Sequence, residues 1–240
     1  MGVSDLGYGL RQPGGWAFDV LAYTENRNLR LTAINPPTKS STNRIATSLP
    51  PVFQCPSRDD SVAPSRLDVL YFGEFQVSLC KRIDYAANCG DVPKETLFGP
   101  LTLDSAEQFY TDYFDEMAQL PSGVMFYRTT YRMADVLDGT SQTILIGEKW
   151  RDPPSSVPGA GSDQPAWVGG SLDNFRFTEE PPLPDHIADA GYLRFGSAHA
   201  GGTHFALVDG STQTIGWRID PKVFAGLGNR HDRQVIDPIY

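Results

Sequence analysis

The most regular hydrophobic pattern in the chain lies at residues 104–120. Apolar side chains recur there with spacings of three and four, which predicts one apolar face on a helix. Asp104 precedes this run and Glu107 follows three residues later, a typical start for a helix. The residues of the apolar face are Ala106, Phe109, Tyr110, Tyr113, Phe114 and Met117.

Three further helices are predicted, at residues 15–28, 132–137 and 220–227. The last has the best boundary signals. Asp220 stands at the N-cap position, Pro221 at the first helical position and Gly228 at the end. Proline is tolerated in the first turn because its missing N–H would lack a helical partner there anyway.

The clearest strand pattern runs from 204 to 218. Asp209-Gly210 divides two β-rich arms and predicts a hairpin with a two-residue turn, pairing Val208 with Ser211 and Ala206 with Gln213. Shorter strands are predicted at 124–127, 143–148, 166–169 and 192–195, and irregular loops at 35–51, 151–164 and 178–185. The resulting fold class is α+β, a loop-rich antiparallel sheet with a few helices.

Composition and charge narrow the function. The chain has 240 residues, which we interpret as one globular domain over 1–240, and its net charge of −9 disfavours nucleic acid as a partner. No apolar run reaches the ~18 residues of a transmembrane helix, and the first residues do not resemble a signal peptide.

Ser197, His199 and Asp209 are the residue types of a hydrolytic triad. However, the sequence around Ser197 is not the GxSxG turn of such enzymes, so a hydrolase is the least favoured function. The alternative places residues 196–202 in a tight loop, with His199 hydrogen-bonded to backbone near the hairpin and Asp209. We therefore predict no catalytic residues.

Cofactor signals are weak. The loop carboxylates Asp163, Asp173, Asp185 and Asp189 are candidate calcium ligands. The signal is weak because no EF-hand pattern occurs. The chain has no CxxC and no histidine at ligand spacing from a cysteine, so no metal site is predicted.

Three cysteines, Cys55, Cys80 and Cys89, leave two states open. Cys55 and Cys80 form a disulfide in an oxidising compartment, or all three remain thiols. Trp150 and Trp167 are candidate ligand contacts together with Asp173, against the alternative that the tryptophans belong to the core.

Several blocks, in order, resemble the DUF1559 family. The most specific is His199 followed after nine residues by Asp209-Gly210. Asp138-Gly139 and Gly147-Glu148-Lys149 lie upstream of it. The other blocks are Gly15-Trp16, Phe53-Gln54-Cys55-Pro56-Ser57, Asp84-Tyr85-Ala86-Ala87-Asn88, Ile219-Asp220-Pro221 and Leu227-Gly228-Asn229-Arg230.

The resemblance implies the globular head of a pilin-like or pseudopilin-like envelope protein, located in the cell envelope or outside the cell. Its motif residues His199, Asp209, Gly210, Asp138, Gly139 and Glu148 are then structural. Partners would be other envelope or pilus-like proteins, or further copies of the chain. Membrane contact would come only from an N-terminal pilin helix that this chain lacks, and an apolar strip of the sheet would be exposed or covered by a loop. The alternative function is an extracellular module that binds a carbohydrate or a calcium-assisted ligand.

Overall fold

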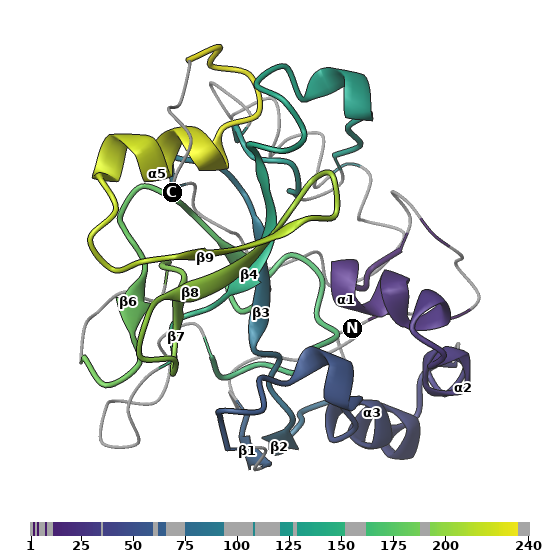
Figure 1. Cartoon of the computed structure of the whole chain (residues 1–240). Helices are drawn as coiled ribbons and strands as arrows, with labels where there is room; N and C mark the ends of the chain where they lie inside the picture. The colour runs from purple at the N-terminus through teal and green to yellow at the C-terminus, as the bar shows by residue number, and fades with distance from the viewer. Residues whose placement is uncertain are drawn as a thin grey trace.

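A five-stranded sheet forms the centre of the molecule in the computed structural model shown in Figure 1. The structure describes residues 2, 4, 8, 12–34, 36–59, 62–65, 75–93, 108, 121–126, 129–151, 162–187 and 193–234. The predicted helix at 104–120 lies outside these residues except for Gln108.

The strands of the central sheet are β3 (Tyr85–Asn88), β4 (Ile144–Glu148), β5 (Phe175–Arg176), β8 (Thr203–Leu207) and β9 (Thr212–Ile215). Their order is β5-β3-β4-β8-β9, and β5 alone pairs in parallel. The predicted α+β class is confirmed, with this parallel edge strand as the departure from a purely antiparallel sheet. Two small pairs accompany it: β1 (Ala63–Pro64) with β2 (Leu79–Cys80), and β6 (Leu183–Pro184) with β7 (Gly196–Ser197).

The β8–β9 hairpin is confirmed, but its predicted register is wrong by one residue. Ala206 pairs with Thr212 rather than Gln213. The Ser211 carbonyl accepts from the Leu207 amide, so the connection has three residues and ends at Gly210, whose φ is +86°. A three-residue loop needs such a left-handed position only at its end, which glycine supplies without strain.

Helix α5 (Pro221–Gly228) closes one side of the sheet over β8 and β9 (Figure 1). Asp220 caps it as predicted, because its Oδ1 accepts from the Lys222 amide at 2.8 Å. The buried side of α5 places Phe224 edge-on to Phe195 and Phe205, with ring centroids 6.4 and 5.8 Å apart. These rings and the aliphatic side chains of β4, β8 and β9 form one apolar core.

The N-terminal helical layer gathers beside the start of β3 (Figure 1). The predicted helix at 15–28 is wrong as one element. It is divided into α1 (Trp16–Asp19), η2 (Val20–Tyr23) and, after a turn, α2 (Arg27–Arg30). Glu25 has a φ of +63°, and a right-handed helix cannot continue through that conformation.

Helix α3 (Lys39–Ala46) lies inside the segment predicted to be a loop. Thr38 and Ser41 form its capping box, with Thr38 Oγ1 accepting from the Ser41 amide at 3.1 Å. The short η3 (Pro51–Phe53) follows it.

The remaining local predictions met mixed outcomes. The turn at 132–137 is confirmed as η4 (Met133–Asp135), and the strand at 143–148 as β4. The described parts of 124–127, 166–169 and 192–195 are not strands but carry at most single bridges. The outer positions of β8 and β9 are largely polar, namely His204, Thr212 and Thr214, so these two strands expose no apolar strip.

Candidate functional site

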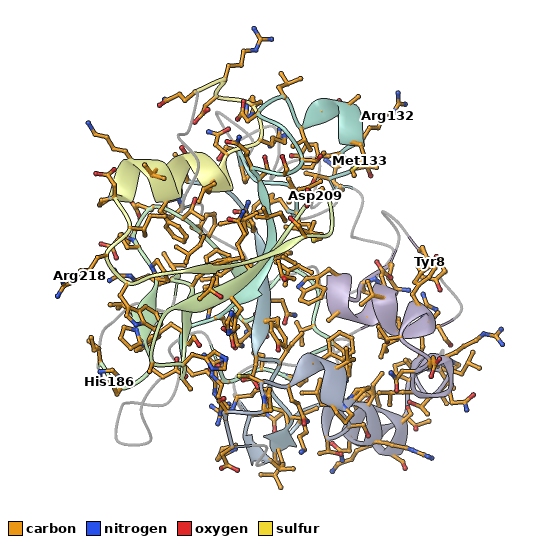
Figure 2. The ribbon with its side chains drawn as sticks, viewed as in Figure 1. Tyr8, Arg132, Met133, His186, Asp209 and Arg218 are labelled. Carbon is orange, nitrogen blue, oxygen red and sulfur yellow. The ribbon has the colours of Figure 1, made fainter. Side chains whose placement is uncertain are left out.

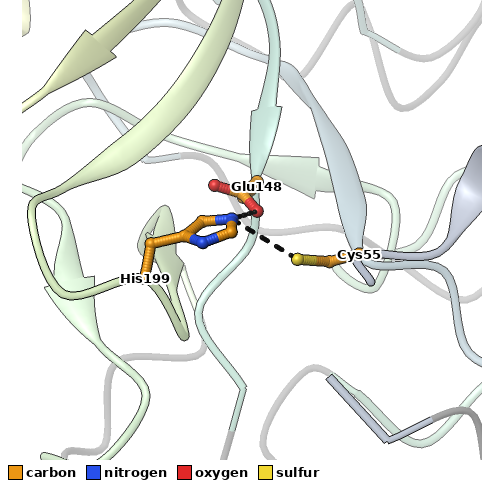
Figure 3. A group of neighbouring side chains, drawn as sticks. All are labelled: Cys55, Glu148 and His199. Atoms are coloured by element: carbon orange, nitrogen blue, oxygen red, sulfur yellow. Dashed lines mark hydrogen bonds and ion pairs between the residues drawn. The ribbon is translucent and has the colours of Figure 1, made fainter. Parts of the chain in front are cut away.

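Three segments far apart in sequence meet at the end of β4 (Figure 3). Cys55 follows η3, Glu148 is the last residue of β4, and His199 follows β7. His199 Nε2 lies 3.1 Å from Glu148 Oε1 and 3.5 Å from Cys55 Sγ. One imidazole nitrogen therefore faces a carboxylate and a sulfur at once.

Backbone contacts orient each of the three side chains. The Cys55 amide donates to Asp84 Oδ2 at 2.8 Å, which fixes the loop after η3. The second oxygen of Glu148 accepts from the His204 amide at 2.9 Å. Ser197 Oγ accepts from the His199 amide at 3.0 Å. The cluster is thus built into the fold and not assembled from free surface side chains.

Burial governs the chemistry of this cluster. Cys55 and Glu148 are 2% and 1% exposed, whereas the His199 side chain is 27% exposed. Burial raises the pKa of the Cys55 thiol, and the hydrogen bond and negative charge of Glu148 raise it further. A nucleophilic cysteine needs a lowered pKa. The cluster therefore holds a protonated thiol rather than an activated one.

Arg58 fastens the Cys55 loop to the end of the sheet. Its Nε and Nη2 donate to the two oxygens of Asp185 at 2.8 and 3.0 Å. Nη2 also donates to the carbonyls of Lys149 and Gly196, at 2.7 and 3.1 Å. Nη1 lies 3.4 Å from Asp84 Oδ1. With its side chain 3% exposed, Arg58 is a buried and fully engaged cation.

A cavity of about 260 Å³ borders the same loop. Its lining includes Lys81, Arg82 and Arg151 as cations and Asp59 and Asp84 as carboxylates. Burial lowers the pKa of Arg82, and the charge of Arg151 lowers it further. Arg82 Nη1 donates to the Ser162 carbonyl, while its buried Nε has no hydrogen-bond partner among the described residues.

A family model described as a protein of unknown function, DUF1559, matches residues 2–222. The chain belongs to the DUF1559 family. No curated protein and no solved structure matches it. Among the described residues of this DUF1559 chain, no helix is long and apolar enough to cross a membrane.

The structure separates the two halves of the family motif. Figure 2 shows Asp209 at the tip of the β8–β9 hairpin, while His199 precedes β8. Five residues of strand span about 16 Å, so the two side chains do not meet. Asp209 instead accepts from the amide and hydroxyl of Ser211, at 2.8 and 2.6 Å. The expected contact of His199 with the hairpin turn is wrong, because its ring faces Glu148 and Cys55.

The other motif residues of the DUF1559 chain also stabilise turns. Asp138 accepts from the amides of Asp232 and Arg233, at 2.9 and 2.7 Å, and so holds the segment after α5. Gly139 follows with a φ of +98°. Ser197 is fully buried, and the partner of its hydroxyl is the His199 amide, so the triad geometry is absent from this described part of the chain.

The candidate ligand contacts are wrong, because all three side chains are buried. Trp150 and Trp167 are both 0% exposed and Asp173 is 2% exposed. Trp167 Nε1 donates to the Ile45 carbonyl at 2.9 Å, and Trp150 Nε1 donates to the Ile187 carbonyl at 3.3 Å. These residues support the core and cannot reach a ligand in solvent.

Two of the four candidate calcium carboxylates, Asp173 and Asp185, form ion pairs with cations of the protein. Asp173 lies 3.6 Å from Lys149 Nζ, and Asp185 pairs with Arg58. Asp189 lies outside the described residues. Within the part of the chain that the structure describes, only Cys55, Glu148 and His199 bring three potential metal ligands together.

Of the two cysteine states that the sequence left open, the structure has the thiols, since Cys55, Cys80 and Cys89 are all free and buried. Cys55 Sγ faces His199, whereas Cys80 ends β2. Reasoning from ligand spacing missed the pairing of Cys55 with His199 because 144 positions separate them. The available signal was that both belong to blocks that carry the family resemblance.

Proposed function

We propose that this chain is the extracytoplasmic head of a pilin-like envelope protein, with a structural or interaction role and no enzymatic activity. Membership of the DUF1559 family supports the envelope role through the architecture that the resemblance implies. The motif residues support the non-enzymatic role, because His199, Glu148, Asp138 and Asp209 make contacts that hold loops and turns. The raised pKa of the Cys55 thiol is also unsuited to nucleophilic catalysis.

The observation that carries an interaction role is an exposed aromatic pair on the N-terminal helical layer. Tyr8 and Tyr23 are 52% and 79% exposed, and their ring centroids lie 6.1 Å apart. Leu31 and Ile34, in the segment after α2, are also exposed. Aromatic side chains are enriched in protein interfaces and carry much of their binding energy. Partners would be other envelope proteins or further copies of the chain.

Sedimentation velocity and cell fractionation test this function. We expect the protein in the envelope fraction of its host, and concentration-dependent association of the purified chain that Tyr23→Asp weakens. Met133→Asp is the matched control, because Met133 is 62% exposed and lies away from Tyr8 (Figure 2). A cytosolic protein that stays monomeric at every concentration would overturn the proposal. Ester or peptide hydrolysis that Cys55→Ala abolishes would overturn its non-enzymatic part.

The cavity beside Cys55 favours a second candidate function, the binding of a small anionic ligand. Arg82 and Arg151 lie close enough for one charge to lower the pKa of the other, and an anion between them would relieve that repulsion. The carbohydrates that fit this lining are acidic ones. Calorimetry with glucuronate should show binding that Arg82→Gln removes and Arg44→Gln, on exposed helix α3, preserves. Equal heats for both variants would exclude this site.

A further inference from the structure

The cluster of Cys55, Glu148 and His199 has the donor spacing of a metal site. Zinc binds sulfur at ~2.3 Å and nitrogen or oxygen at ~2.0–2.2 Å in tetrahedral geometry. Those bond lengths place neighbouring donors about 3.6 Å apart for sulfur and nitrogen and about 3.4 Å apart for nitrogen and oxygen. The observed separations of 3.5 Å and 3.1 Å lie close to both values. All three donor atoms lie within 4.8 Å of one another.

We propose that Cys55 Sγ, Glu148 carboxylate and His199 Nε2 bind a single divalent transition-metal ion, with Zn²⁺ the best match to this donor set. Mixed sulfur, nitrogen and oxygen donors suit zinc better than calcium or magnesium, which prefer oxygen alone. Binding displaces the thiol proton of Cys55 to solvent, so that a thiolate, a carboxylate and a neutral imidazole surround the cation.

The contacts around the cluster are those that orient metal ligands. His199 Nδ1 lies 3.4 Å from Ser57 Oγ, so a protonated Nδ1 can donate a hydrogen bond to this hydroxyl. In that tautomer Nε2 carries a lone pair, which faces the cluster. Glu148 Oε2 is held by the His204 amide, which directs Oε1 toward His199. The Cys55 amide is anchored on Asp84. Each ligand is thus held from outside before the ion arrives.

The position of the site indicates what the ion would do. Its ligands come from the loop after η3, the end of β4 and the loop after β7, and the bound ion would join all three segments. Cys55 and Glu148 are buried and His199 is partly exposed, which leaves water able to reach the ion from the His199 side. This role goes beyond the proposed envelope function and does not depend on it.

Cobalt binding to the purified full chain tests the site. Co²⁺ replaces Zn²⁺ in tetrahedral sites, and a thiolate ligand gives it an intense charge-transfer band. We expect this band at one equivalent of Co²⁺ in the reduced, metal-stripped protein, and its loss when Zn²⁺ is added. Absence of the band and of any calorimetric Zn²⁺ binding in the folded wild type would overturn the proposal.

Matched variants assign the ligands. Cys55→Ser, Glu148→Gln and His199→Gln should each weaken Zn²⁺ binding at least about 100-fold, and Ser57→Ala by about 10–100-fold as the loss of an orienting contact. Cys80→Ser and His231→Gln are the controls for a thiol and an imidazole outside the cluster. Circular dichroism verifies the fold of each variant. Binding that all three ligand variants retain would also overturn the site, as would binding lost equally in the controls.

Discussion

Replacing Arg58 by methionine should be among the most destabilising single changes in this chain. The substitution keeps much of the side-chain volume but removes a cation that is 3% exposed. Asp185 would lose both of its guanidinium contacts, and the carbonyls of Lys149 and Gly196 would lose a donor. Asp84 would keep Arg151 as a partner at 3.0 Å.

The magnitude follows from these losses. Breaking a buried ion pair by removing one partner costs about 3–5 kcal/mol, because the other charge stays buried. The remaining Arg151–Asp84 contact keeps the expected loss within that range. The free energy of unfolding of native proteins is about 5–15 kcal/mol, so this substitution would remove a large share of it. Arg58→Lys should lose about half as much, since lysine keeps the charge but not the bidentate geometry.

Urea denaturation followed by tryptophan fluorescence measures the effect, with a chelator present so that metal binding does not contribute. The matched control is Arg44→Met, because Arg44 is exposed on α3 and its loss should change the free energy of unfolding by less than about 0.5 kcal/mol. If the free energy of unfolding of Arg58→Met lies within about 1 kcal/mol of that of the control, the Arg58 network does not stabilise the fold and our reasoning is refuted.

Three further changes test other parts of the fold. Burial lowers the pKa of Lys149 to about 7, partly offset by the charge of Asp173, so the unfolded chain binds more protons between about pH 7 and 10.5. This group should therefore make the free energy of unfolding rise with pH in that window, and denaturation of Lys149→Met at pH 8 and 10 should show a smaller rise than wild type. Gly147→Ala places a Cβ against the Phe205 ring and should cost about 1–3 kcal/mol by overpacking, whereas an unchanged thermal midpoint would show that the ring can shift. Asp220→Ala removes the cap of α5 and should cost about 1 kcal/mol in urea denaturation, while Asp220→Asn should preserve most of it.

Local signals predicted the elements that local chemistry determines. The Asp220 cap and the Asp209-Gly210 turn act over a few residues, and both α5 and the β8–β9 hairpin exist. The register of that hairpin depends on whether the loop has two or three residues, which the dipeptide alone does not specify. Glu25 divided the first predicted helix through a left-handed backbone conformation that its residue type does not favour.

Non-local elements escaped prediction for a physical reason. Strand β5 has two residues and β3 has four, too few to show a period of two. Pairing with β3 defines β5, and pairing with β5 and β4 defines β3. The Cys55, Glu148 and His199 cluster is equally non-local. In the sequence each residue belongs to a separate motif block, and only the folded sheet brings the three together. Burial, likewise, decided that Trp150 and Trp167 belong to the core.

The separation of the cluster residues along the chain also bears on how the protein folds. His199 meets Glu148 across 51 positions and Cys55 across 144. Contacts of such long range require large loops to close, and proteins rich in them fold slowly. We therefore expect the cluster to form only after β3, β4 and β8 have assembled, so that it reports completion of folding. In a nascent or partly unfolded chain, Cys55 would lack its contact with His199, and its thiol would be open to alkylation. Protection of the Cys55 thiol from alkylation would therefore mark the last folding step.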